Sequence, residues 1–249
     1  IALNVNRRIG DISCAWRLSY SPASPAFAIW VVIYFWTLVS IVLQLAHGYT
    51  APTYIGAPQA NYLISLAWVA TGVWGVTFGR GANDDDIPGF IGLAAFVLVA
   101  AALLALGAVG IEQSWRSQDP WKMVGVGVPY SLFAGWLCVA AVANIGIAVQ
   151  AATTPPDPHC TRGRYRTRLS EQPVEPSRFS AWVPFIVACG VSVGAFLFPD
   201  PVLCVPVFWG IWNMRRTLRN VVAMEVLAVT CAATVVQIAT ERWVIKEVS

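Results

Sequence analysis

Long apolar runs separated by short polar segments are the dominant pattern of this sequence. The run 26–43 contains 18 residues and no charge. A helix of that length measures about 27 Å, close to the hydrocarbon thickness of a bilayer. Because a helix satisfies its own backbone hydrogen bonds in lipid, the run is predicted to be a transmembrane helix. Pro22 and Pro25 precede it and prevent the helix from extending backwards.

Runs of the same kind recur along the chain and predict an all-α fold. We expect a polytopic transmembrane helical bundle of about seven transmembrane helices. The predicted helices span residues 26–46, 60–79, 88–110, 122–149, 180–198, 202–214 and 219–240. The sixth is short, and Pro206 within it predicts a kink.

The predicted helices divide the chain into three parts. Residues 1–150 form a four-helix membrane region with an N-terminal segment. Residues 151–179 form an extramembrane loop rich in Pro and Arg, and residues 180–249 form a three-helix membrane extension.

The distribution of Lys and Arg supports this count of helices. With seven helices, 12 basic residues fall on one side of the membrane and 4 on the other. Merging the fifth and sixth helices gives a split of 9 to 7. Since basic loops favour the non-translocated side, the richer side is predicted to be cytoplasmic, stromal or matrix.

Composition agrees with a membrane protein and excludes several function classes. Charged residues make up 12% of the chain, against about 25% in soluble domains. The net charge of +3 is too small to indicate a nucleic-acid partner. Four of the six cysteines lie in apolar runs and the other two lack CxxC spacing, so we expect no disulfide framework and no metal site. The sequence has no HExxH motif, no P-loop and no GxSxG that follows a strand, which predicts that the protein is not an enzyme.

Several short motifs resemble those of one known family. They are Gly10-Asp11-Ile12-Ser13, Ser21-Pro22-Ala23, the segment Phe27-Ala28-Ile29-Trp30-Val31-Val32-Ile33-Tyr34, the Trp74–Phe78 pair, and Trp136 with Asn144 eight residues later. In these motifs the chain resembles the larger relatives of the tryptophan-rich sensory protein (translocator protein, TspO/MBR-like) family. It departs from the family pattern at Ser24, at Thr71, and at Pro129-Tyr130, which lies one turn early. The family also has one more helix before the Pro-rich turn.

The resemblance implies an all-helical membrane protein that binds tetrapyrroles and sterol-like lipids in a Trp-lined pocket. The residues expected to line it are Trp30, Tyr34, Trp68, Trp74, Trp136 and Asn144. Tyr34 and Asn144 would supply its polar groups. The alternative is that these side chains serve helix packing and anchoring at the membrane interface.

A chlorophyll or another tetrapyrrole would also accept an axial ligand from the protein. Besides Asn144, the candidates are Gln44, His47, Gln150, Glu225 and Gln237. Each could instead cap a helix or form an interhelical hydrogen bond. Glu225 is also a functional candidate because it is an ionisable residue inside a predicted span.

Four arginines alternate along the long loop, at Arg162, Arg164, Arg166 and Arg168. They are predicted to contact anionic lipid headgroups or a neighbouring subunit. A solvated basic loop is the alternative.

Together these features predict a non-enzymatic integral membrane protein that binds a tetrapyrrole or lipid. We expect it to be an accessory subunit of a larger photosynthetic or respiratory membrane complex, with other membrane subunits as partners. A first residue other than Met and the tetrapyrrole ligands of the family favour a plastid thylakoid, with the mitochondrial or bacterial inner membrane as alternatives. The alternative functions are a transporter of small solutes, lipids or porphyrins, and a ligand-responsive membrane sensor.

Overall fold

The computed structural model describes Leu18 and residues 24–48, 58–80, 87–112, 122–153 and 200–214. Apart from single residues at the edges, these form helices. In chain order they are the 3-10 helix η1 (Ser24–Ala28), α2 (Ile29–Gly48), α3 (Pro58–Arg80), α4 (Ile87–Glu112), the π-helix η3 (Met123–Gly127), α6 (Val128–Thr153) and α8 (Pro201–Met214).

Four helical stretches are long and apolar enough to cross a membrane, counted within the described residues. They are Pro25–Ala46, Pro58–Gly79, Gly89–Glu112 and Met123–Thr153. These stretches confirm the first four predicted helices. The helix α8 coincides with the sixth predicted helix and has 14 residues. The fifth and seventh, 180–198 and 219–240, lie outside the described residues, so the total of seven remains a prediction.

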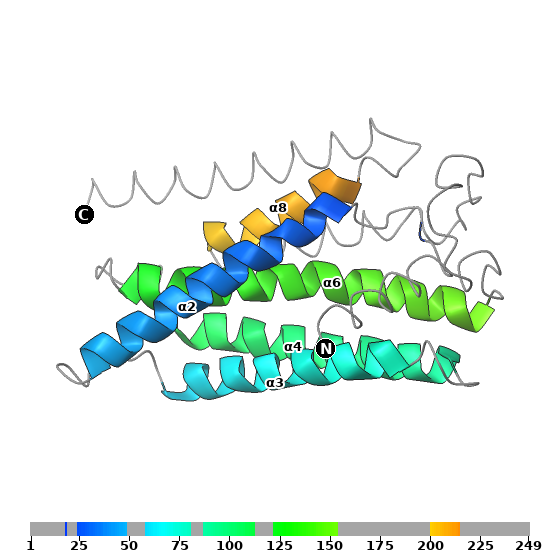
Figure 1. Cartoon of the computed structure of the whole chain (residues 1–249), viewed down its shortest axis with the longest axis horizontal. Coiled ribbons are helices and arrows are strands. Elements are labelled where there is room, and N and C mark those ends of the chain that lie inside the picture. The colour runs from blue at the N-terminus through cyan, green and yellow to red at the C-terminus, as the bar shows by residue number, and fades with distance from the viewer. Residues whose placement is uncertain are drawn as a thin grey trace.

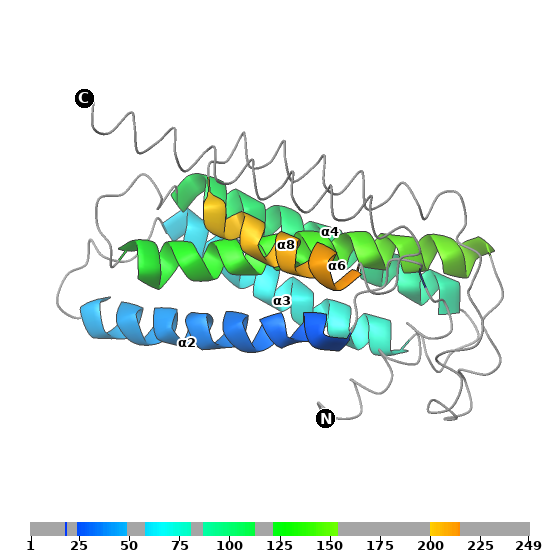
Figure 2. The same cartoon turned by 90° about the horizontal axis from the view of Figure 1, so that it is seen from above.

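Helices α3, α4 and α6 lie side by side along the long axis of the molecule (Figures 1 and 2). The helices α2 and α8 cross α6 obliquely in Figure 1. Helix α2 contacts mainly α6 and η3, whereas the most extensive contacts of α4 are with α3 and α6. The described helices therefore form a three-helix layer with two further helices placed against α6.

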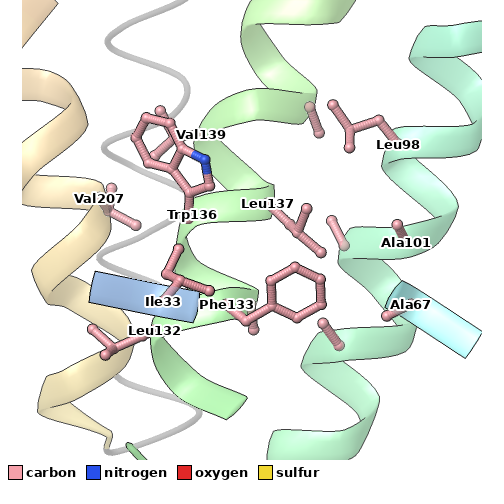
Figure 3. Close-up of a cluster of buried hydrophobic side chains, with 14 of the residues drawn as sticks. Ile33, Ala67, Leu98, Ala101, Leu132, Phe133, Trp136, Leu137, Val139 and Val207 are labelled. Carbon is pink, nitrogen blue, oxygen red and sulfur yellow. The ribbon is translucent and has the colours of Figure 1, made fainter. Parts of the chain in front are cut away.

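Small residues allow α4 to approach its neighbours closely. Its buried positions follow helical spacing and are mostly alanine: Ile91, Ala94, Ala95, Leu98, Ala101, Ala102, Ala105, Ala108 and Val109. Figure 3 shows Leu98 and Ala101 of α4 facing Leu137 of α6 in the cluster of buried side chains. In lipid, where apolar burial gives little driving force, such close packing is a main source of helix association.

The π-helix η3 runs directly into α6 and explains how Pro129 is tolerated near the start of a long span. Proline donates no backbone hydrogen bond, so the preceding turn must rearrange. Here the Val128 N–H donates to the Met123 carbonyl, five residues earlier. The helix is therefore continuous through Thr153, four residues beyond the predicted end at 149.

The contact between α6 and α8 is close enough to require glycine on both helices. A Cβ added at Gly135 would lie 2.2 Å from the Leu203 carbonyl oxygen, and one added at Gly210 would lie 2.7 Å from a methyl of Val139. Buried Asp200 begins α8, where its carboxylate accepts the backbone N–H groups of Val202 at 3.0 Å and Leu203 at 3.3 Å. This is an N-cap, which satisfies helix donors that have no partner within the helix.

Two further hydrogen bonds attach α8 to the rest of the bundle. At one end, the Ser131 hydroxyl of α6 donates to the Asp200 carboxylate. Farther along α8, Trp209 Nε1 donates to the Ala26 carbonyl of η1 at 3.0 Å. Helix α8 is thus fixed to both α6 and the beginning of the first span.

Candidate functional site

The outer faces of α2 and α3 are apolar stripes. On α2, besides Val32, Tyr34 and Ile41, the exposed positions include the set Val31, Phe35, Leu38, Val42 and Leu45. On α3 the exposed set is Tyr62, Leu66, Val69, Val73 and Val76. Both sets recur at spacings of three and four, which places each set on one side of its helix. In a membrane-spanning chain such faces are solvated by lipid tails.

Six aromatic side chains from η1, α2, α3 and α6 are in mutual contact, and we call them the aromatic cluster. They are Phe27, Trp30, Tyr34, Trp68, Phe133 and Trp136. The closest pair is Trp68 of α3 and Phe133 of α6, whose rings stack at 4.0 Å with an interplanar angle of 6°. Tyr34 stacks on Trp68 at 5.9 Å and on Trp30 at 5.4 Å.

Exposure rises from the inner to the outer end of this cluster. Phe133 and Trp136 are fully buried, Trp30 and Trp68 are half-buried, and Tyr34 is 56% exposed. In Figure 3, Phe133 and Trp136 both project from α6 into the cluster of buried side chains. The aromatic cluster therefore has a rigid interior on α6 and a flat ring surface that is open on the outside.

The cluster bridges two helices whose backbones hardly approach each other. Few backbone positions of α2 and α3 come close together, whereas each helix has a close neighbour elsewhere in the bundle. The Tyr34–Trp68 stack spans this junction, with Phe133 of α6 beneath it. We call the junction of α2 and α3 over α6 the α2–α3 seam.

Four uncharged polar residues lie in the same seam, toward the C-terminal end of α2, and we call them the polar cluster. They are Ser40, Gln44, Asn61 and Tyr130. Gln44 Nε2 donates to Ser40 Oγ at 2.9 Å, and the Tyr130 hydroxyl donates to Asn61 Oδ1. The Gln44 side chain also lies near the Tyr130 hydroxyl. The polar cluster therefore connects α2, α3 and α6.

Trp74 and Asn144 were predicted to line the pocket with the other four residues. In the structure they form a separate pair. Trp74 Nε1 donates to Asn144 Oδ1 at 2.9 Å, and Asn144 Nδ2 donates to the Ala140 carbonyl at 2.9 Å. Trp74 has ring contact with Phe78 at 5.7 Å. The structure thus brings together four of the six predicted pocket residues and places the other two in an interhelical hydrogen bond.

Trp136 contributes a buried donor for which the described residues offer no acceptor. The side chain is 2% exposed, and its Nε1 has no hydrogen-bond acceptor among the described residues. A buried donor without an acceptor costs free energy, and an acceptor atom on a bound molecule would recover it.

The candidate axial ligands differ in their hydrogen bonds and in their burial. The amide of Gln44 is engaged with Ser40, as that of Asn144 is with Trp74. Gln150 is half-buried near the end of α6, where its backbone carbonyl accepts the Thr153 hydroxyl at 3.3 Å. His47 lies in the last turn of α2, but its side chain is outside the described set.

The remaining predicted contacts lie outside the described residues. They are Glu225, Gln237, Arg162, Arg164, Arg166 and Arg168. Within the part of the chain that is described, no three His, Cys, Asp or Glu side chains come together as a metal site.

Sequence reasoning missed the inner part of the site. Phe133 was not singled out, although it precedes Trp136 by three residues and so shares its side of the helix. Asn61 was also missed, since a single amide near a helix start gives no pattern. Its role becomes visible only through the contact with Tyr130, 69 residues away.

Comparisons with known proteins agree with the motifs and the helices. No curated protein and no solved structure matches the chain. A family model described as TSPO-like protein matches residues 2–155, which include the four membrane-spanning stretches and both clusters. With more than half of its length matched, the chain belongs to the TSPO-like protein family.

Proposed function

We propose that this membrane protein binds a flat hydrophobic molecule, a tetrapyrrole or a sterol-like lipid, against the aromatic cluster in the α2–α3 seam. One observation carries the proposal: the parallel stack of Trp68 on Phe133 at 4.0 Å and 6°, continued outward by half-exposed Tyr34. Such a surface offers ring faces to a planar molecule that arrives from the lipid phase. Aromatic pairs add about 0.5–1.5 kcal/mol each beyond area burial.

Binding would proceed through the ring face of a tetrapyrrole rather than through axial coordination of its metal. Both ends of the Asn144 amide are engaged in hydrogen bonds at 2.9 Å, and Gln44 donates to Ser40. The oxygen of Asn144, the atom that would ligate a metal, already accepts from Trp74, whereas Gln44 uses Nε2 rather than its oxygen for the hydrogen bond to Ser40. A metal-free porphyrin is therefore an adequate ligand, and His47 is the residue whose substitution would test for coordination.

The role in a larger assembly and the location of the protein rest on the sequence alone. We propose a non-enzymatic accessory subunit of an energy-transducing membrane complex, with a plastid membrane favoured over a mitochondrial or bacterial one. The alternating arginines 162–168 are the proposed contacts to a neighbouring subunit or to lipid headgroups.

The test is isolation of the protein from its own membrane in mild detergent, followed by an absorption spectrum, solvent extraction and measurement of the mass of the particle. We expect a tetrapyrrole or sterol-like lipid at a fixed stoichiometry. A colourless preparation that also lacks bound lipid, and that fails to take up added porphyrin saturably, would contradict the proposal. Solute movement in liposomes by a lone monomer would instead favour the transporter alternative.

A further inference from the structure

The polar cluster at one end of the α2–α3 seam has no assigned role. We propose that it receives the polar end of the bound molecule and selects molecules whose polar end is uncharged. This inference rests on the proposed function, because it concerns the same ligand. It names the ligand class as a flat, uncharged amphiphile that ends in a hydroxyl, ester or amide.

The two clusters form one continuous surface. Asn61 and Trp68 are seven residues apart on α3, so they share a side of the helix at a separation of about 10 Å along its axis. Tyr130 and Phe133 are one turn apart on α6 and lie about 4.5 Å apart along the axis. A molecule with its flat body against exposed Tyr34 and half-buried Trp68 would thus place one end at half-buried Asn61, which Tyr130 holds in place.

The polar cluster, like the aromatic cluster, has a buried inner part and a more exposed outer part. Ser40 and Tyr130 are buried, at 3% and 7% exposure, while Gln44 and Asn61 are half-buried. The buried hydroxyls hold the two amides in place through the Gln44–Ser40 and Tyr130–Asn61 hydrogen bonds. Amides both donate and accept, so they suit a neutral polar group that can do either.

Among the described residues, the charged side chains nearest this end are Lys122 and Glu112, and the Glu112 carboxylate acts on Tyr130. Helix α2 and the stretch Met123–Thr153 contain no charged residue, and α3 has only Arg80, 19 residues after Asn61 and about 28 Å away along the helix. Lys122 lies eight residues before Tyr130, but it pairs with Glu112 at 2.9 Å. A carboxylate in this seam would therefore lose its hydration, and the basic group nearest to it among the described residues, Lys122, is already paired, which is unfavourable.

Two porphyrins with the same ring provide the test. Protoporphyrin IX carries two carboxylates, and its dimethyl ester carries none. Each would be titrated into the full-length protein in nanodiscs of neutral lipid, with tryptophan quenching as the readout and empty nanodiscs to correct for partitioning. We expect the ester to bind roughly ten-fold more tightly per molecule in the bilayer.

Variants on α3 and α6 then assign the preference to the polar cluster. Asn61→Ala and Tyr130→Phe should reduce the preference for the ester to below about three-fold, and Asn61→Lys should reverse it in favour of the acid. The matched control is Ser65→Ala, an exposed position one turn away whose hydroxyl donates only to the Asn61 carbonyl. That variant should keep the wild-type preference.

The outcomes separate this inference from the proposed function. Equal or tighter binding of the free acid, or an ester preference that survives in both Asn61→Ala and Tyr130→Phe, would overturn the inference and leave the proposed function standing. Failure of both porphyrins to bind saturably would overturn the proposed function and the inference with it.

Discussion

Helix α6 has two very different contacts. Against α8 it packs so closely that Gly135 has no space for a Cβ, and the start of α8 is capped and attached through Asp200 and Ser131. Toward α2 and α3 it presents Phe133 and Tyr130 to a junction where the other two helices meet through side chains.

The two contacts of α6 therefore have different roles: one stabilises the bundle, and the other is suited to binding a ligand. Backbone contact with glycine at the crossing leaves no room for a third molecule. Ring and amide contacts, in contrast, are made by side chains, and exposed Tyr34 and half-buried Trp68 and Asn61 can exchange them for similar contacts with a ligand. We therefore assign the α6–α8 contact to stability and the α2–α3 seam to ligand binding.

The largest effect should come from filling the α6–α8 contact. Gly135→Val places new atoms against the Leu203 carbonyl, at 2.2 Å for the Cβ alone. Since a backbone oxygen cannot rotate away, we expect a loss of about 3 kcal/mol, the upper end for overpacking. Thermal unfolding in mild detergent measures it.

The control for that substitution is Gly72→Val on α3, where a Cβ meets nothing within 4 Å. Its stability should change by less than about 1 kcal/mol, because only helix propensity is altered. Equal losses in the two variants would show that the α6–α8 crossing is not the tight contact described.

Removing the cap of α8 should have a smaller effect. Asp200→Ala removes the acceptor for two backbone N–H groups and for the Ser131 hydroxyl, so we expect a loss of about 2 kcal/mol. Buried Cys204, one turn into α8, should then react faster with maleimide, as measured by mass spectrometry of its peptide. Unchanged protection of Cys204 would contradict the account, and Thr153→Ala, which removes an exposed hydroxyl, is the control.

In the aromatic cluster, Phe133→Leu keeps an apolar side chain but removes the stack on Trp68. We expect stability to fall by about 1 kcal/mol and the affinity for porphyrin to fall with it. Phe96→Leu on α4 is the matched control because Phe96 is 71% exposed to the lipid side. If both variants bind porphyrin as the wild type does, the cluster is a packing element only.

The smallest effect should come from the separate tryptophan pair. Trp74→Phe preserves an aromatic ring beside Phe78 and removes the donor to Asn144. Interhelical hydrogen bonds in bilayers contribute on average about 0.6 kcal/mol. A small decrease in the unfolding midpoint with unchanged porphyrin affinity is the expected result, and a loss of affinity would place Trp74 in the site.

The pattern of apolar runs was sufficient to predict the four membrane-spanning stretches of the described residues. The stripe of Phe27, Trp30 and Tyr34 at spacings of three and four marked the face of α2 that meets α6. The end of α6 was placed four residues early, since Ala and Thr after Gln150 have no stop signal.

Contacts between distant segments could not be read from the sequence. The separation of Trp74 from Trp68 could have been predicted, since residues six apart on a helix differ by about 120° in direction, but the contact between Trp74 and Asn144 could not. The glycine crossing joins Gly135 to Leu203, 68 residues later, and glycine in an apolar run has many possible explanations. The assignment of α8 as the neighbour of α6 therefore needed the structure.

The most direct test of the central claim compares two tryptophans of the same helix. Protoporphyrin IX dimethyl ester would be titrated into the Trp68→Leu and Trp74→Leu variants in nanodiscs of neutral lipid. The readout is the quenching of porphyrin emission by a quencher in the lipid phase. This readout does not depend on the substituted tryptophans. If the α2–α3 seam is the binding site, Trp68→Leu loses about ten-fold in affinity, equivalent to about 1.4 kcal/mol, and Trp74→Leu stays within two-fold of the wild type, about 0.4 kcal/mol. Equal losses in the two variants, or a larger loss in Trp74→Leu, would contradict the claim.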